Sequence, residues 1–159
     1  MDSAPPMGAN GAPQSVDQLP PEAIALASRF FDAARQGQMD MFEQALPRGL
    51  PANLTNDKGD TLLMLASYHG HAPLVSLLLK HGADPNSLND RGQSPLAGVV
   101  FKNEAEVIKV LLENGADPEV GEPSALEATK VFRQEEYESM FREQIEKLKA
   151  GQTRATNGH

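Results

Sequence analysis

The sequence predicts an all-α fold, a solenoid of about four stacked helix-turn-helix repeats with short hairpin-like tips and degenerate terminal repeats. The first indication is the turn at Asn56–Gly59, which returns 33 residues later at Asn89–Gly92. The second is Gly82-Ala83-Asp84-Pro85, which returns at residues 115–118. The third is a set of apolar residues at helical spacing between these turns. Because one helix pair cannot bury its apolar face alone, this fixed period indicates units stacked in a row.

The chain divides into a central repeat region and two tails. The first segment is rich in Pro, Gly, Ala and Gln and has almost no large apolar side chain, so burial cannot offset the entropy lost on ordering it. We therefore expect a disordered N-terminal tail at residues 1–21 and, for the same reason, a disordered C-terminal tail at residues 151–159. The expected repeat domain is 22–150, with units at about residues 22–55, 56–88, 89–121 and 122–150.

The first helix of each central unit has a recognisable start and end. Thr61 and Ser94 stand where an N-cap is expected, because a hydroxyl oxygen can accept a hydrogen bond from the first helical turn. Pro95 follows at the first helical position, where a missing N–H costs nothing. This helix should end at Gly70 in one unit and near Asn103 in the next, and Asn103 is then expected to cap the following helix.

The second helix of each central unit has an apolar stripe at helical spacing. Gly82 and Gly115 follow these helices, and we expect both glycines to end them in a left-handed conformation. The predicted buried stripes are Leu74, Leu77 and Leu78 in one unit, then Val107, Val110 and Leu111 in the next.

The two terminal units depart from this pattern. The first unit lacks the hairpin turn and carries Phe30 and Phe31 near the start of its first helix. The last unit restarts early, at Pro123–Leu126, and ends in a helix expected at about residues 134–149. Both units are expected to act as caps, because the end faces of a solenoid would otherwise expose core. The stripe predicted to be buried on the final helix is Tyr137, Phe141, Ile145 and Leu148.

With these motifs established, the chain resembles the ankyrin repeat, in its small free-standing microbial or fungal form. The resemblance is carried by Gly59–Ala66, by Gly70-His71, by Leu77–Asn86 and by the same motifs at residues 92–96 and 111–118. It extends over about residues 22–142 and implies an ankyrin-repeat solenoid whose function is protein–protein interaction, as a module, adaptor or scaffold. The chain departs from the family pattern where Met64 and Ala97 replace its usual histidine.

The resemblance implies where a partner protein would bind, namely the hairpin tips and the exposed side of the first helices, which together form a concave groove. By register, Tyr68 and Phe101 should lie side by side in a row that also holds Arg35 and Val131. The residues expected to flank this row are Gln36, His69, Lys102 and Phe132. Large aromatic rings on an otherwise polar face often carry interface energy, although they could instead only pack between adjacent helices. The predicted partner-binding residues are Lys58, Asp60, Tyr68, His69, Arg91, Gln93, Phe101 and Lys102.

No motif indicates catalysis, a cofactor or a metal. The chain contains no cysteine, and its glycines at 59 and 92 belong to hairpin turns instead of a phosphate-binding loop. His69, His71 and His81 lie close in sequence, but no further ligand stands at the spacing of a zinc site. His71 is interpreted as a structural turn residue. We expect no enzymatic activity and no bound metal or cofactor.

Charge leaves the class of partner open. The net charge is −8, and residues 104–146 hold twelve Asp and Glu against four Lys and Arg, so a nucleic-acid partner is disfavoured. This acidic half either solubilises the end of the solenoid or attracts a basic client. The alternative function is accordingly an acidic chaperone or escort for a basic client such as a ribosomal protein. The chain is expected to be a monomer. Because no segment is suited to a signal peptide or a membrane span, we expect it in the cytoplasm, and a nuclear location is also open.

Overall fold

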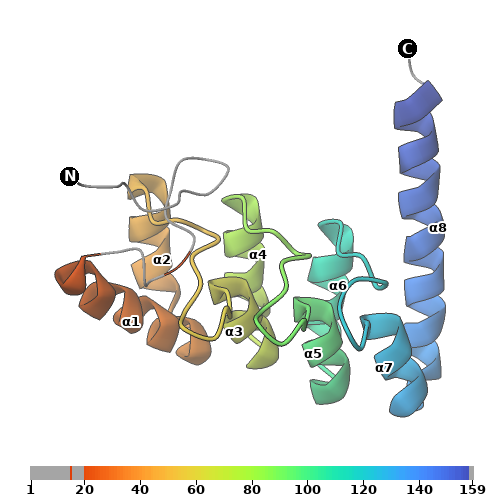
Figure 1. The fold of residues 1–159 in the computed structure, drawn as a ribbon, viewed down its shortest axis with the longest axis horizontal. Coiled ribbons are helices and arrows are strands. Elements are labelled where there is room, and N and C mark those ends of the chain that lie inside the picture. The colour runs from red at the N-terminus through yellow and green to blue at the C-terminus, as the bar shows by residue number, and fades with distance from the viewer. Residues whose placement is uncertain (1–14, 16–19, 158–159) are drawn as a thin grey trace.

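A computed structural model describes Ser15 and residues 20–157, with side chains up to Gln152. The helices form four successive pairs (Figure 1). Their bounds are α1 Pro21–Gln36, α2 Met39–Ala45 with a short 3₁₀ turn η2 at Leu46–Arg48, α3 Leu62–Tyr68, α4 Ala72–Lys80, α5 Pro95–Lys102, α6 Ala105–Glu113, α7 Ala125–Val131 and α8 Glu135–Asn157. The expected all-α ankyrin solenoid is confirmed.

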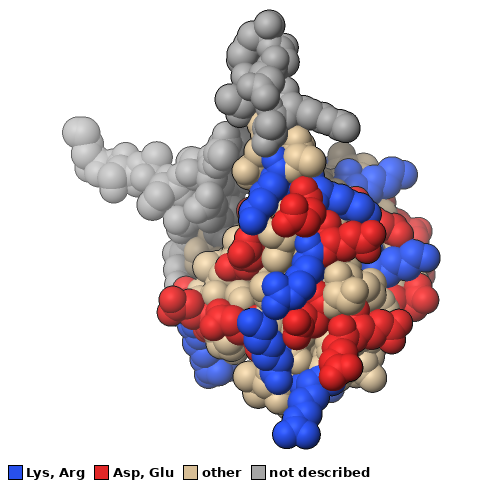
Figure 2. Space-filling view, turned by 90° about the vertical axis from the view of Figure 1, so that its right-hand side faces the viewer, with Lys and Arg blue, Asp and Glu red and all other residues tan. Residues whose placement is uncertain are grey.

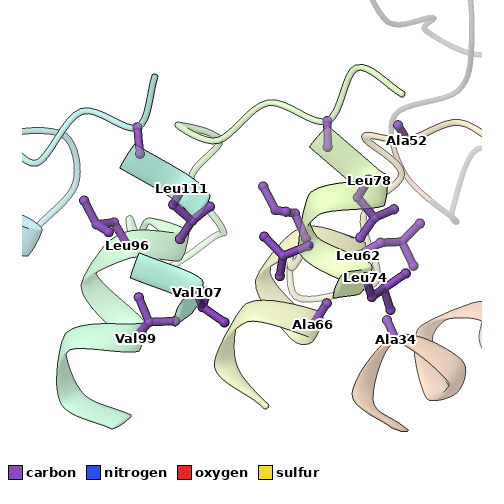
Figure 3. Close-up of a cluster of buried hydrophobic side chains, with 14 of the residues drawn as sticks. Ala34, Ala52, Leu62, Ala66, Leu74, Leu78, Leu96, Val99, Val107 and Leu111 are labelled. Carbon is purple, nitrogen blue, oxygen red and sulfur yellow. The ribbon is translucent and has the colours of Figure 1, made fainter. Parts of the chain in front are cut away.

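The helices stand in two rows that enclose one continuous core. Helices α1, α3, α5 and α7 contact one another in sequence, while α2, α4 and α6 form the second row and α8 packs against α7 (Figure 1). Leu62, Leu78, Val99 and Leu111 are fully buried between the rows (Figure 3). Small residues such as Ala66 alternate with these larger ones, so neighbouring helices approach closely.

The predicted helix caps of the central units are confirmed. The Thr61 side-chain oxygen accepts a hydrogen bond from the Met64 N–H at 3.0 Å, and the Ser94 side-chain oxygen accepts one from the Ala97 N–H at 3.1 Å. Gly82 and Gly115 take the expected left-handed conformation, with φ of 96° and 91°. The cap chemistry read from the sequence therefore corresponds to the local structure.

The hairpin tips repeat one hydrogen-bond pattern. The Asn56 side-chain oxygen accepts from the N–H groups of Lys58 and Asp60, both at 3.0 Å. The equivalent Asn89 accepts from the N–H groups of Arg91 and Gln93, also at 3.0 Å. Both turns thus position the side chains that follow them toward the same edge of the solenoid.

A second pair of asparagines joins consecutive units. The Asn53 amide donates to the Gly82 carbonyl at 3.0 Å and accepts from the Asp84 N–H at 2.7 Å. One repeat later, the Asn86 amide makes the same two bonds, to the Gly115 carbonyl and from the Asp117 N–H, at 3.2 and 2.7 Å. The next position in this register is Glu119, so the series ends where the last unit begins.

The expectation that Asn103 caps the helix after it is wrong. Asn103 instead ends α5 in a left-handed conformation, with φ of 57°, and Glu104 precedes α6 without a side-chain cap bond. The Asn103 side-chain oxygen accepts a hydrogen bond from the Tyr137 hydroxyl at 2.6 Å. Because this oxygen bonds to α8, it couples the third unit to the terminal helix.

The terminal helix is longer than predicted. It was expected at about residues 134–149, with a disordered tail from residue 151, but α8 continues to Asn157. Its predicted stripe is buried at Tyr137, Phe141 and Ile145. The Gln144 amide donates to the carbonyls of Leu112 and Ala116 at 2.9 and 3.1 Å, which fixes α8 against the end of α6. The expected N-terminal tail lies outside the described residues, apart from Ser15, Pro20 and Pro21.

Candidate partner-binding groove

A groove of about 460 Å³ runs along the first helices of the second and third units. Its walls come from α3, α5 and α7 and from the tip that precedes α5. Aromatic rings and small apolar side chains line the middle of the groove, whereas polar side chains line its edge at the tips. Its lining includes Asp60, Tyr68, Arg91, Gln93, Gly98, Phe101 and Phe132.

The floor of the groove depends on a glycine inside α5. A Cβ atom added to Gly98 would lie 3.6 Å from Cδ2 of Tyr68 and would meet no other atom closely. The equivalent position one repeat earlier is Leu65. Because Gly98 has no side chain, it keeps open a space that a leucine would fill. A glycine inside a helix is also destabilising by roughly 0.5–1 kcal/mol relative to alanine.

Three aromatic rings are exposed in this groove. Tyr68 is 42% exposed, Phe101 59% and Phe132 44%. The rings of Phe101 and Phe132 meet edge to face, with centroids 5.2 Å apart. About half of the surface of these side chains, from 42% to 59%, therefore remains available to another surface.

The structure brings most of the predicted partner-binding residues to this groove. Asp60, Tyr68, Arg91, Gln93 and Phe101 line it. Whether they contact a partner stays a prediction.

Three of the predicted residues lie beside the groove instead of in its lining. The Lys102 amine is 5.0 Å from the centroid of the Tyr68 ring, in cation–π geometry. His69 meets the edge of the same ring, with centroids 5.5 Å apart. Lys58 is exposed on the neighbouring tip, where its carbonyl accepts from the Asp90 N–H at 3.1 Å.

The row of outward-facing residues shifts by one position in the last unit. Val131 was expected to continue the row of Tyr68 and Phe101, but Phe132 lines the groove in its place. Val131 is 71% exposed and is absent from the lining. Val131 stands seven residues after its N-cap Ser124, as Phe101 does after Ser94, so the early restart does not explain the difference. The neighbouring Phe132 lines the groove because its ring packs against Phe101.

Asp60 also has a structural role at the edge of the groove. Its carboxylate accepts a hydrogen bond from the Asn89 amide at 2.8 Å, and the same amide donates to Gln93 at 2.9 Å. These bonds join the tips of two consecutive units. Arg91 and Gln93 are therefore the polar side chains at the edge that remain most exposed.

The two neighbouring histidines differ in what holds them. A ring nitrogen of His71, Nε2, lies 2.7 Å from the Arg35 carbonyl oxygen, and its ring occupies the space where a Cβ on Gly37 would lie. His71 thus joins two units, as its interpretation as a turn residue suggested. His69 is exposed and stacks on His71 at 6.5 Å between ring centroids. Burial, and then the positive charges of His71, Lys102 and Arg35, lower the pKa of His69.

The described residues include no cluster of three or more His, Cys, Asp or Glu side chains that could hold a metal ion. Within the same part of the chain, no helix is both long enough and apolar enough to cross a membrane.

Gly98 is a part of the groove that was not predicted from the sequence, whereas Phe132 was expected only as a neighbour of the row. A signal for Gly98 was present, because a glycine inside the predicted helix after Pro95 needs a packing or functional reason.

Comparison with known proteins agrees with the geometry. Residues 30–121, more than half of the chain, match a family model described as ankyrin repeats in three copies. A 60-residue stretch is 55% identical to an ankyrin repeat protein from Pseudomonas aeruginosa, covering 38% of this chain and 35% of that protein. The matched stretch therefore spans about a third of the length of this relative.

Proposed function

The chain belongs to the ankyrin-repeat family, and from this premise we propose that it is a non-enzymatic binding module that holds a partner protein in the groove over Tyr68 and Phe101. Such a module or adaptor needs a firmly packed wall and an exposed apolar surface whose burial by a partner is favourable. The stacked first helices provide the wall, and the exposed rings provide the surface.

The observation that carries this proposal is the exposure of Tyr68 and Phe101 in one groove, opened by Gly98. A ring needed only for packing between helices would be expected to be buried as Phe31 and Phe42 are. Exposed aromatic rings in a groove with a polar edge fit the usual composition of interface hot spots. Arg91 and Gln93 at the edge would orient the bound chain.

The direct test removes both rings. Tyr68→Ala combined with Phe101→Ala should lower affinity for the main cellular partner by about a hundredfold or more, because two hot-spot side chains are lost. The melting temperature should change little, since neither side chain belongs to the buried core. Affinity capture with mass spectrometry identifies the partner, and titration calorimetry on the purified pair measures the loss.

Leu26→Ala is the matched control. Leu26 is also an exposed apolar residue, at 52%, but it lines a separate hollow on the first unit together with Phe30 and Met41. Partner binding should survive this change. Binding that survives the double replacement and disappears with Leu26→Ala would move the site to the first unit and contradict the proposal.

The alternative function, an escort for a basic client, rests on the excess of acidic residues at positions 104–146. Figure 2 views the α8 end of the molecule, where acidic and basic side chains are interspersed on one face. Salt separates the two functions: an escort should lose affinity steeply as ionic strength rises, whereas binding through aromatic rings should lose little. A monomeric state and a cytoplasmic or nuclear location remain predictions, tested by sizing chromatography and by imaging of the tagged chain.

A further inference from the structure

Four basic side chains gather beside Tyr68, where the first helices end. Arg35 lies in the last turn of α1 and Lys102 in the last turn of α5, while His69 and His71 flank the turn after α3. We call these four residues the basic cluster. His71 Nε2 lies 2.7 Å from the backbone carbonyl oxygen of Arg35, and the His71 ring stacks with the ring of His69. Lys102 makes the cation–π contact with Tyr68.

Two members of the basic cluster already have partners. Arg35 is paired with Asp32 at 2.8 Å, and His71 is held by the Arg35 carbonyl. Within the described residues, Lys102 forms no ion pair, and neither Lys102 nor the ring of His69 has a hydrogen-bond partner. The Glu104 carboxylate lies against Gly70 but makes no ion pair with the cluster.

The basic cluster therefore presents two polar side chains without an anionic partner at the end of an apolar groove. Burial, and then the positive charges of His71, Lys102 and Arg35, lower the pKa of His69. The chain as a whole has a net charge of −8. A long acidic segment would be repelled by this overall charge, whereas a single carboxylate beside an apolar residue would gain from the local positive charge.

We propose that the groove is specific for an extended peptide segment in which an apolar side chain is accompanied by a glutamate or aspartate. The apolar side chain occupies the space over Gly98 between Tyr68 and Phe101, and the carboxylate meets Lys102 and His69. This inference rests on the proposed function, because it names the chemistry of the partner for the same groove.

The test uses a displayed library of random linear peptides selected on the immobilised full-length chain. Enriched peptides should combine an aromatic or large aliphatic residue with a nearby acidic one, and their binding should disappear with Tyr68→Ala plus Phe101→Ala. A representative synthetic peptide is then titrated against the chain by fluorescence anisotropy.

A double-mutant cycle isolates the carboxylate contact. Lys102→Gln and His69→Gln should each lower the affinity for the acidic peptide by about fivefold to tenfold, the range of a charge-assisted contact at an interface edge. Neither change should lower the affinity for the same peptide once its glutamate or aspartate is replaced by the corresponding amide, glutamine or asparagine. Lys80→Gln is the control, because Lys80 is an exposed lysine in the last turn of α4, in the second row of helices and outside the lining of the groove.

The outcomes separate this inference from the proposed function. Enriched peptides that are basic, or without charge preference, yet require Tyr68 and Phe101 would overturn the acidic specificity and leave the groove as a binding surface. Peptides that bind without Tyr68 and Phe101, or a selection that enriches nothing, would overturn both. An equal loss for the acidic and amide peptides with Lys102→Gln would also contradict the carboxylate contact.

Discussion

The central and terminal repeats of this molecule contrast in how they are held. The two central units share N-caps at Thr61 and Ser94, matching asparagine turns and an asparagine link from the preceding unit. The last unit replaces these with a capping box, in which Ser124 and Glu127 exchange two bonds at 3.1 Å, and with the long helix α8.

This contrast shows that the central units carry the exposed groove, whereas the last unit covers the end of the core. Each central unit is supported on both sides, so its first helix can leave aromatic rings exposed without losing its position. The last unit is supported on one side only, and it buries Tyr137 and Phe141 on α8 to cover the end of the core. The exposed groove therefore lies where the flanking units hold the wall most rigidly.

The largest expected difference is in core packing. Leu78 in α4 is fully buried between two neighbouring units, and Leu78→Ala should lower the free energy of unfolding by about 3 kcal/mol or more. Ile145 in α8 is slightly exposed and has one neighbouring unit, so Ile145→Ala should cost less, about 2 kcal/mol. Urea denaturation measures both. An equal or larger loss at Ile145 would mean that the terminal helix carries the stability of the stack.

The asparagine link offers a sharper comparison. Asn86→Ala removes two hydrogen bonds between the second and third units and should lower the free energy of unfolding by about 1–3 kcal/mol. Glu119 holds the same position one repeat later but is exposed, so Glu119→Ala should be nearly neutral. If the two variants unfold at the same denaturant concentration, the link does not couple the units.

Ser67 departs from the pattern within the central units themselves. Its hydroxyl is fully buried in α3 and has no hydrogen-bond partner, whereas Ala34 and Val100 occupy the equivalent positions. Ser67→Ala should raise the free energy of unfolding by about 1 kcal/mol, because an unsatisfied polar group is removed. Thr61→Ala is the comparison, and the loss of its cap should lower stability by about 1 kcal/mol. A calorimetric melting temperature that is lower for Ser67→Ala than for the unchanged chain would mean that the Ser67 hydroxyl does have a stabilising partner.

The smallest expected effects are on the pH dependence of stability, and they differ between the two regions. The pKa of His69 in the folded chain lies below its usual 6.5, so the unfolded chain takes up this proton first and stability falls as the pH drops below 6.5. Bonds from the Ser124 N–H and hydroxyl lower the pKa of Glu127 below its usual 4.5, so its contribution is present above pH 4.5 and is lost in more acidic solution.

Two matched variants separate these ranges. His69→Gln should flatten the stability profile just below pH 6.5, and Glu127→Gln should flatten it only below pH 4.5. Denaturant titrations across the pH range measure both profiles. A profile that His69→Gln leaves unchanged near pH 6 would mean that burial and the neighbouring positive charges do not lower the pKa of this ring.

Much of the fold could be predicted from the sequence because turns and caps depend on local chemistry. Thr61, Ser94, Gly82 and Gly115 act at positions defined by their own neighbours, and each was placed correctly. Asn103 was not, because the competing bond from Tyr137 comes from a residue far along the chain. The extension of α8 to Asn157 also could not be predicted from a segment with little apolar periodicity.

The groove was predictable in outline only. A strict repeat period places Tyr68 and Phe101 in one row, and the structure has both in the groove. The last member of the row, Val131, was placed by its distance from the N-cap Ser124, but the neighbouring Phe132 packs against Phe101 and lines the groove instead. The opening over Gly98 depends on a missing side chain, which apolar periodicity does not register.

Replacement of Gly98 by leucine tests the central claim most directly. The side chain would enter the groove beside Tyr68, while the helix gains roughly 0.5–1 kcal/mol from losing an interior glycine. We expect the Gly98→Leu variant to melt at the same temperature or higher and to lose its partner in a calorimetric titration. A variant that is folded and binds the partner with unchanged affinity would show that the groove is not the binding site.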